Sequence, residues 1–180
     1  YETRYEDVVL GRYGADDPVG STDGEAWTYA NEVIYPFGHG LSYSDFSQTL
    51  NDVTYDAASG EYVASVTVKN ESGMPGKHVV HLYAQTPYGD YERANLVEKS
   101  AIQLAGFAKT GELAEGESET VEVRVDEYLL ASYDYTNLKG YYLSGGDYYF
   151  AIGDNVHDAL NNVLAAKAAA GGQVDAAALS

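Results

Sequence analysis

The residues best suited to acid–base or metal chemistry in this 180-residue chain are its four histidines, His39, His78, His81 and His157. None of them lies beside a G-x-S-x-G nucleophile elbow, so the pattern of a serine hydrolase is missing. His78 and His81 stand three positions apart in an alternating run, which places them on opposite faces of a strand and makes them poor joint metal ligands. The chain has no Cys, which removes thiolate nucleophiles and thiolate metal ligands. We therefore expect no catalytic, cofactor-binding or metal-binding residue, and no cofactor.

Carboxylates are abundant, with 28 Asp and Glu, so their number alone cannot identify the carboxylate pair of a glycoside hydrolase. One group, Asp16, Asp17, Asp23 and Glu25, gathers oxygen ligands in a Gly-rich stretch and suggests calcium. The EF-hand spacing fails, because its first ligand position would fall on Val19. Most acidic clusters are expected to be solvated faces.

Tyrosine is unusually frequent, with 18 copies against one Trp and four Phe. An exposed row of Tyr rings could stack on sugar rings. The candidates for such a row are Tyr133, Tyr135, Tyr141, Tyr142, Tyr148 and Tyr149. In half-buried strands the same residues are more often cross-strand packing pairs, so two interpretations stay open.

The charge balance limits the partners of the chain. The 28 acidic residues stand against 10 Lys and Arg, which gives a formal net charge of −18. Such a chain repels nucleic-acid phosphates and anionic membrane surfaces, and we expect neither as a partner. Apolar runs stay below the roughly 18 residues of a membrane span, and no signal peptide is visible after Tyr1. The absence of Cys fits the bacterial cytoplasm, which is the location we expect, with secretion as the alternative.

The elements that would position these residues are mostly short strands. Apolar residues alternate or cluster in six runs, at 62–69, 80–84, 100–108, 121–126, 141–143 and 148–152. Six or seven short strands in about 100 residues predict a mainly β fold, an antiparallel sandwich of immunoglobulin or fibronectin type III kind. No Cys pair is present, which favours the fibronectin-like variant.

The two flanks of this sandwich, which we place at 45–153, differ from it. Residues 1–44 collect Gly, Pro and acidic residues without a period, which predicts an irregular segment that belongs to something larger. Residues 154–180 predict a short helix and a tail or linker. The helix has Asp154 or Asn155 as its cap and Gly171-Gly172 at its end.

The segment YPFGHGLSYSDF, from Tyr35 to Phe46, resembles the end of the α/β-sandwich domain of family-3 glycoside hydrolases, the β-glucosidase family. The opening YETRYEDVVLG is similar to the stretch that precedes this signature. Three strings then resemble, in order, the fibronectin type III-like domain of that family, namely VASVTVKNESGMPGKHVVHLYAQTP (63–87), IQLAGFAKTGELAEGESETVEVRVD (102–126) and GDYYFAIGDNVHDA (146–159). The resemblance implies that residues 1–44 are the end of the α/β-sandwich domain and its linker.

The resemblance also implies a function. In this family the nucleophilic Asp lies in a barrel domain and the acid/base residue is supplied elsewhere, and neither motif is present here. The leading hypothesis is therefore a non-catalytic structural module that packs against the catalytic domains of the same polypeptide and contributes to the rim of the active site. The parent would hydrolyse terminal β-glycosidic bonds. In permuted members the helix and tail would lead toward the barrel, and both domain orders stay open.

Two alternatives are a carbohydrate-binding sandwich that uses surface Tyr residues, with an oligosaccharide as partner, and a cell-surface adhesive sandwich.

The resemblance to this family makes one further prediction about the first segment. Without a neighbouring domain, its apolar residues Val8, Val9, Leu10, Trp27 and Phe37 lack full burial, which predicts local mobility or self-association.

Overall fold

The computed structural model describes residues 34–171. In chain order its elements are β1 (Phe46–Asp56), β2 (Glu61–Asn70), β3 (Val79–Gln85), α3 (Asp90–Asn95), β4 (Gln103–Lys109), β5 (Ser118–Asp126), the 3-10 helix η1 (Glu127–Leu130), β6 (Ser132–Asp134), β7 (Gly140–Tyr142), β8 (Tyr149–Ile152) and α4 (Val156–Ala169). Neither described α-helix has the length and apolar content that a bilayer-spanning segment requires.

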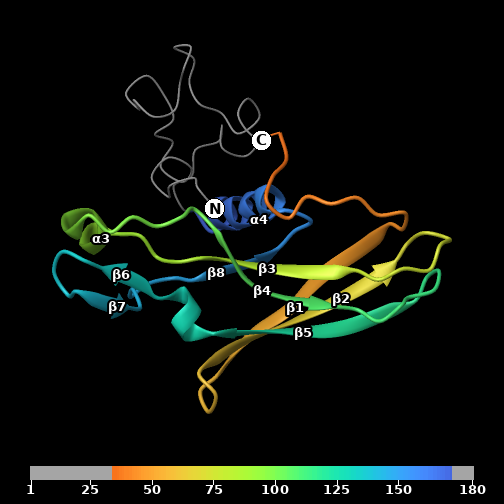
Figure 1. Cartoon of the computed structure of the whole chain (residues 1–180), viewed down its shortest axis with the longest axis horizontal. Coiled ribbons are helices and arrows are strands. Elements are labelled where there is room, and N and C mark those ends of the chain that lie inside the picture. Colours follow the sequence, from red (N-terminus) through yellow and green to blue (C-terminus); the bar gives the residue numbers. More distant parts are fainter. Residues whose placement is uncertain (1–33, 172–180) are drawn as a thin grey trace, which may run out of the picture.

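The strands form two antiparallel three-stranded sheets, with the orders β1-β2-β5 and β4-β3-β8, and β6 pairs with β7 as a small hairpin. The two sheets lie one over the other, and α3, β6 and β7 lie together at one end of the molecule (Figure 1). The mainly β antiparallel sandwich that the sequence predicts is confirmed.

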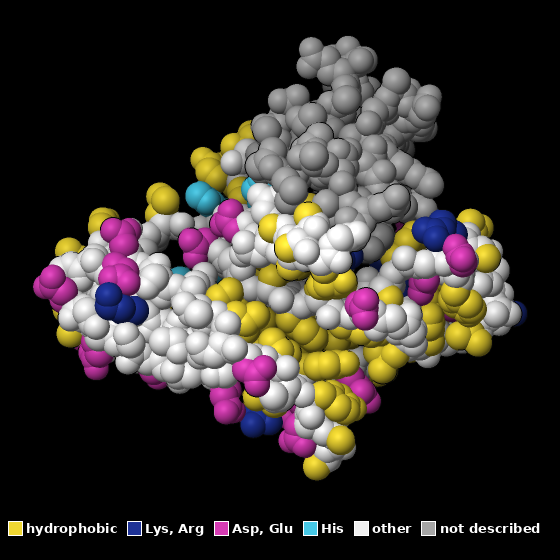
Figure 2. All heavy atoms as spheres, turned by 180° about the vertical axis from the view of Figure 1, so that it is seen from behind, with side chains coloured by type: hydrophobic (Ala, Val, Ile, Leu, Met, Phe, Trp, Pro, Cys, Tyr) yellow, Lys and Arg dark blue, Asp and Glu magenta, His cyan; other side chains and the backbone are white. Residues whose placement is uncertain are grey.

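The core of the sandwich follows from the period of two along the strands. Ala64, Val66 and Val68 of β2 are fully buried, whereas the residues between them are partly exposed. The alternate valines of β5 and the even-numbered residues of β3 face the same core. Acidic side chains are spread over the periphery of the molecule, with few Lys and Arg among them (Figure 2).

Helix α4 covers the outer face of the β4-β3-β8 sheet and creates a second core. Its Leu160 and Leu164 are buried together with Tyr83 of β3 and Ile102. The helix begins after Asn155, whose side-chain oxygen accepts hydrogen bonds from the N–H groups of the first turn at 2.9 and 3.0 Å. The predicted C-terminal helix is confirmed, and its cap is Asn155 rather than Asp154.

Some elements were not predicted. Strand β1 lacks a clean alternation, because its register shifts between Leu50 and Asp52 and none of its residues is fully buried. The run predicted at 100–108 becomes a strand only from Gln103 onward, since Ala101 and Ile102 are drawn into the second core beneath α4. Helix α3 was not predicted from the sequence.

Candidate functional site

The described histidines do not assemble into a catalytic or metal site. His78 packs against Phe46 with ring centroids 5.1 Å apart, whereas His81 packs against Tyr83 at 6.1 Å. Their neighbours belong to different cores, as expected for opposite faces of one strand. Residues 34–171 contain no group of three or more His, Asp or Glu placed to hold a metal ion. The suggested calcium group, Asp16 to Glu25, lies outside these residues.

The six candidate tyrosines separate into two sets. Tyr133, Tyr135 and Tyr141 are exposed around the β6–β7 hairpin, whereas Tyr142, Tyr148 and Tyr149 are partly buried. Tyr133 and Tyr141 are direct cross-strand partners, with ring centroids 5.1 Å apart and ring planes 72° apart. Rings at such an angle make an edge-to-face packing pair and not one flat stacking surface. The hairpin therefore favours the packing interpretation.

The most unusual electrostatic feature is a buried ion pair between Glu92 of α3 and Lys99, which follows it. Their charged atoms lie 3.2 Å apart, and the two residues are only 4% and 8% exposed. The Glu92 carboxylate also accepts hydrogen bonds from Ser144 Oγ at 2.7 Å and from Tyr142 Oη at 3.1 Å. The Lys99 ammonium donates to the Pro87 carbonyl at 2.6 Å and to Ser144 Oγ. We call these four residues, Glu92, Lys99, Tyr142 and Ser144, the polar cluster.

Local geometry explains why Glu92 points into this cluster. It is the third residue of α3, and its second oxygen accepts the backbone N–H of Gly89 at 2.8 Å, which caps the helix start. The short helix then ends at Leu96 in the left-handed conformation, with a φ of 56°, and the chain turns so that Lys99 faces back toward Glu92. The sequence Gly89-Asp90-Tyr91-Glu92, a small residue with Glu three positions later, is a capping signal that could have predicted α3.

The polar cluster holds its carboxylate ionised. Burial alone would raise the pKa of Glu92, but the hydrogen bonds from Ser144 and Gly89 and the charge of Lys99 lower it to about 2. Burial lowers the pKa of Lys99, and the neighbouring carboxylate opposes that effect. An acid for glycoside hydrolysis needs the opposite environment, one that keeps a carboxyl group protonated near neutral pH.

A second buried carboxylate, Asp134, anchors the β6–β7 hairpin. It accepts the backbone N–H groups of Thr136 and Asn137 at 2.8 and 2.9 Å, and Tyr91 Oη of α3 at 2.6 Å. These bonds, with that of Asn137 first, lower the pKa of Asp134 to about 2. Among residues 34–171, every carboxyl group with a clearly shifted pKa has it lowered, which describes Asp56, Glu71, Glu92 and Asp134.

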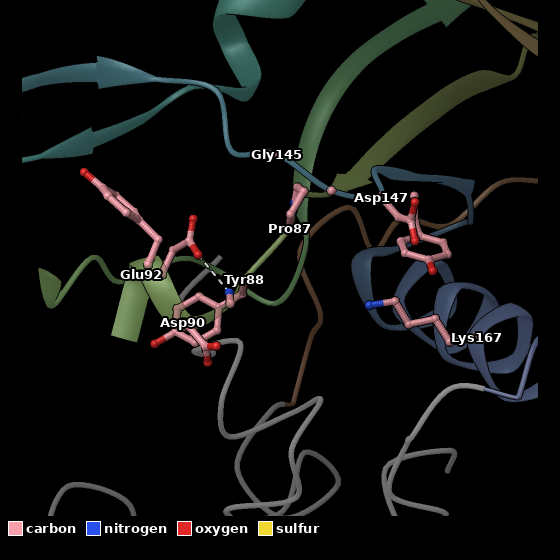
Figure 3. Close-up of a pocket in the computed structure, with 11 residues that line it drawn as sticks. Pro87, Tyr88, Asp90, Glu92, Gly145, Asp147 and Lys167 are labelled. Atoms are coloured by element: carbon pink, nitrogen blue, oxygen red, sulfur yellow. Dashed lines mark hydrogen bonds between the residues drawn. The ribbon is translucent and has the colours of Figure 1, made fainter. Parts of the chain in front are cut away.

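A cavity of about 460 Å³ lies beside the polar cluster. Tyr88 and Asp90 lie on one side of it, and Asp147 and Lys167 lie on the other, with Gly145 between them (Figure 3). The Lys167 ammonium lies 4.5 Å from the centroid of the Tyr149 ring. Of the tyrosines predicted to contact sugar, this cavity uses only Tyr149, and Tyr88 and Tyr91 join it from a segment that the sequence did not single out.

Comparisons with known proteins agree with this architecture. The family model described as fibronectin type III-like domain matches residues 78–156, which end at the first residue of α4. Beta-glucosidase A of Butyrivibrio fibrisolvens is 37% identical over 145 residues, covering 71% of this chain and 16% of that protein. The chain carries a fibronectin type III-like domain of the kind found in family-3 β-glucosidases.

Other β-glucosidases give the same result. A β-glucosidase of Ruminococcus albus is 34% identical over 137 residues, covering 73% of this chain and 14% of the relative. The crystal structure of a β-glucosidase from Paenibacillus barengoltzii superposes with a TM-score of 0.63 at 27% identity, over 87% of this chain and 19% of that one. The structure of a β-glucosidase from Streptomyces venezuelae in complex with D-glucose superposes with a TM-score of 0.61 at 27% identity, over 82% of this chain and 20% of that one. The chain thus spans a small part of each relative, and in those relatives the matching domain is one part of a larger polypeptide.

Proposed function

We propose that this chain is a non-catalytic structural module of a β-glucosidase-type glycoside hydrolase, which packs against the catalytic domains of its own polypeptide. The similarity to fibronectin type III-like domains of β-glucosidases supports the family context. The lowered pKa values of its buried carboxyl groups support a structural role for them, because ionised, fully hydrogen-bonded carboxylates are poor proton donors.

The observation that carries the proposal is the exposed apolar segment 34–43. Leu41 and Tyr43 are 94% and 95% exposed, and Phe37, which the sequence predicted to lack full burial, is 56% exposed. The backbone around them is nevertheless fixed. The Phe37 carbonyl accepts the N–H of Val156 at 2.8 Å, and Ser44 Oγ donates to the Met74 carbonyl at 3.0 Å. Large apolar side chains that are exposed on an ordered backbone are typical of a surface that another domain or molecule covers.

Two measurements test this role. Incubation of the chain with aryl β-glucosides should give no turnover, and turnover that survives repurification would refute the non-catalytic assignment. The double variant Leu41→Ser/Tyr43→Ser should lower the concentration-dependent association of the chain while its melting temperature stays the same. Leu138→Ser is the matched control, because Leu138 is also exposed but lies on the β6–β7 connection. Equal effects of the two variants would contradict an interface at 34–43.

The adhesive alternative depends on the acidic residues between Asp16 and Glu25, which lie outside the described part of the chain. It requires a melting temperature that rises with calcium and falls again with a chelator. An unchanged melting temperature would leave the structural module as the remaining hypothesis of the two.

A further inference from the structure

The cavity between the α3 segment and α4 has the features of a ligand site. Its volume of about 460 Å³ lies within the roughly 300–1,000 Å³ typical of small-molecule pockets. Figure 3 shows Tyr88 and Asp90 on one side of the space, and Asp147 and Lys167 opposite them. Aromatic rings and charged groups therefore face the same volume from three segments of the chain, 87–92, 145–149 and α4.

The electrostatics of this cavity differ from those of the whole chain, which carries a net charge of −18. Each lining carboxylate has a cation nearby. Asp90 forms an ion pair with Arg93 at 2.8 Å, and Glu92 is paired with Lys99 at 3.2 Å. Burial lowers the pKa of Lys167, and the charge of Asp147, the third lining carboxylate, opposes that effect. Because the charges are locally balanced, neither an anion nor a cation gains a strong net attraction, and a neutral ligand is favoured.

The lining combines apolar ring surface with fixed polar atoms. The Lys167 ammonium lies 4.5 Å from the Tyr149 ring centroid, and the Arg93 guanidinium lies 5.8 Å from that of Tyr88, so both cations are held against aromatic rings. Carboxylates accept hydrogen bonds from hydroxyl groups, and an ammonium donates to them. A pyranose ring has the matching chemistry, since its C–H faces are apolar and its edge carries hydroxyl groups.

We propose that the cavity lined by Tyr88, Asp90, Asp147, Tyr149 and Lys167 binds a neutral pyranose sugar. The ring of the sugar contacts the tyrosines, and its hydroxyl groups donate to the carboxylates and accept from Lys167. This role goes beyond the structural one, because a module that only packs against its neighbours needs no such site.

The test is a calorimetric titration of the 180-residue chain with glucose and with cellobiose. Saturable binding of at least one of them is expected. Lys167→Met and Asp147→Asn, which keep side-chain size, should each weaken this binding about tenfold, as expected for the loss of one charged hydrogen bond. Tyr133→Ala is the matched control, since Tyr133 is half exposed on the β6–β7 hairpin and outside the cavity. It should leave the affinity unchanged.

Two charged compounds, the cation choline and the anion glucose 6-phosphate, are titrated in the same way. Both should bind more weakly than glucose. The proposal is overturned by any of three results: no saturable binding of either sugar in the millimolar range, a loss of binding in Tyr133→Ala with none in Lys167→Met, or tighter binding of choline than of glucose. Melting temperatures of the variants, which should match that of the parent chain, separate a lost site from a lost fold. None of these results depends on whether the segment 34–43 is an interface.

Discussion

Replacing Glu92 by Gln should remove a large part of the stability that fastens α3 to the rest of the domain. The folded pKa of about 2 compares with an ordinary value of 4.5. Since one pKa step corresponds to about 1.4 kcal/mol, the ionised carboxylate contributes about 3 kcal/mol to the free energy of unfolding at neutral pH. The general cost of breaking a buried ion pair, about 3–5 kcal/mol, agrees with this figure. Glu92→Gln should therefore lower the free energy of unfolding by about 3 kcal/mol.

The physical reason lies in the contacts of the two carboxylate oxygens. One accepts from Ser144 and Tyr142 and faces Lys99, and the other accepts from the Gly89 N–H. An amide in this position must direct its NH₂ group at one of these donors, and it leaves the buried ammonium without its counter-charge. Because the folded pKa is lowered, this stability is complete above pH 4.5 and is lost as the pH falls from 4.5 toward 2. Glu92→Gln should therefore lack the part of the decrease in the free energy of unfolding that the parent chain owes to Glu92 between pH 4.5 and 2.

Urea unfolding followed by circular dichroism, at neutral pH and at a series of acidic pH values, measures both effects. The matched control is Glu71→Gln. Glu71 forms an ion pair with Lys69 at 2.7 Å, a shorter distance than that between Glu92 and Lys99, but the side chains of Glu71 and Lys69 are both more than 40% exposed. Glu71→Gln should leave the unfolding midpoint unchanged, because solvent screens exposed pairs. If Glu92→Gln behaves like this control, the polar cluster does not stabilise the fold and the reasoning fails.

Three more predictions concern other positions. Burial lowers the pKa of His78 below 6.5, so the unfolded chain takes up a proton first and stability falls as the pH drops below 6.5. His78→Phe should reduce this slope below pH 6.5, and urea midpoints that keep the parent slope would contradict it. Gly38→Ala should destabilise by about 1–3 kcal/mol, because Gly38 has a φ of +88° and an added Cβ would lie 2.6 Å from Tyr83 Oη. The control Gly40→Ala, with nothing within 4 Å, should be neutral in the same thermal melt. Asn155→Ala should cost about 1 kcal/mol through loss of the α4 cap, and a thermal melt that matches the parent would show that the cap is dispensable.

The elements that could be predicted from the sequence are those with local, periodic signals. Strands β2 and β5 alternate cleanly because one face is completely buried, and α4 has a capping residue before a helical pattern. Strand β1 was missed because the irregularity near Asn51 interrupts its period. The fold class was predicted from the number and spacing of the strands. These two quantities change little when the boundary of a single strand is predicted wrongly.

The candidate site could not be predicted, because its residues are brought together only by the fold. Glu92 and Ser144 are 52 positions apart, and no spacing rule links them. Tyrosines were recognised as sugar-contacting candidates by type, but their exposure depends on which strand face is covered. Tyr142 is turned into the polar cluster, whereas Tyr141, the next residue along the chain, is exposed on the hairpin.

The way in which α3 is attached has a consequence for how the molecule opens. A helix of six residues has no independent stability. The segment between β3 and β4 is held by the polar cluster, by the hydrogen bond from Tyr91 to Asp134, and by its apolar residues Val97, which is buried, and Tyr88, which packs against the second core. Opening this segment therefore breaks a few polar contacts and exposes Val97 and Tyr88, whereas separation of the sheets requires both hydrophobic cores to be exposed. Residues 86–99 should form a cooperative unit of their own, which exchanges its amide protons by sub-global opening while β2 exchanges only by complete unfolding. Such an opening would displace the cavity residues between Pro87 and Glu92 while the sandwich stays folded. The rate of ligand entry would then follow the local opening and not the stability of the whole domain.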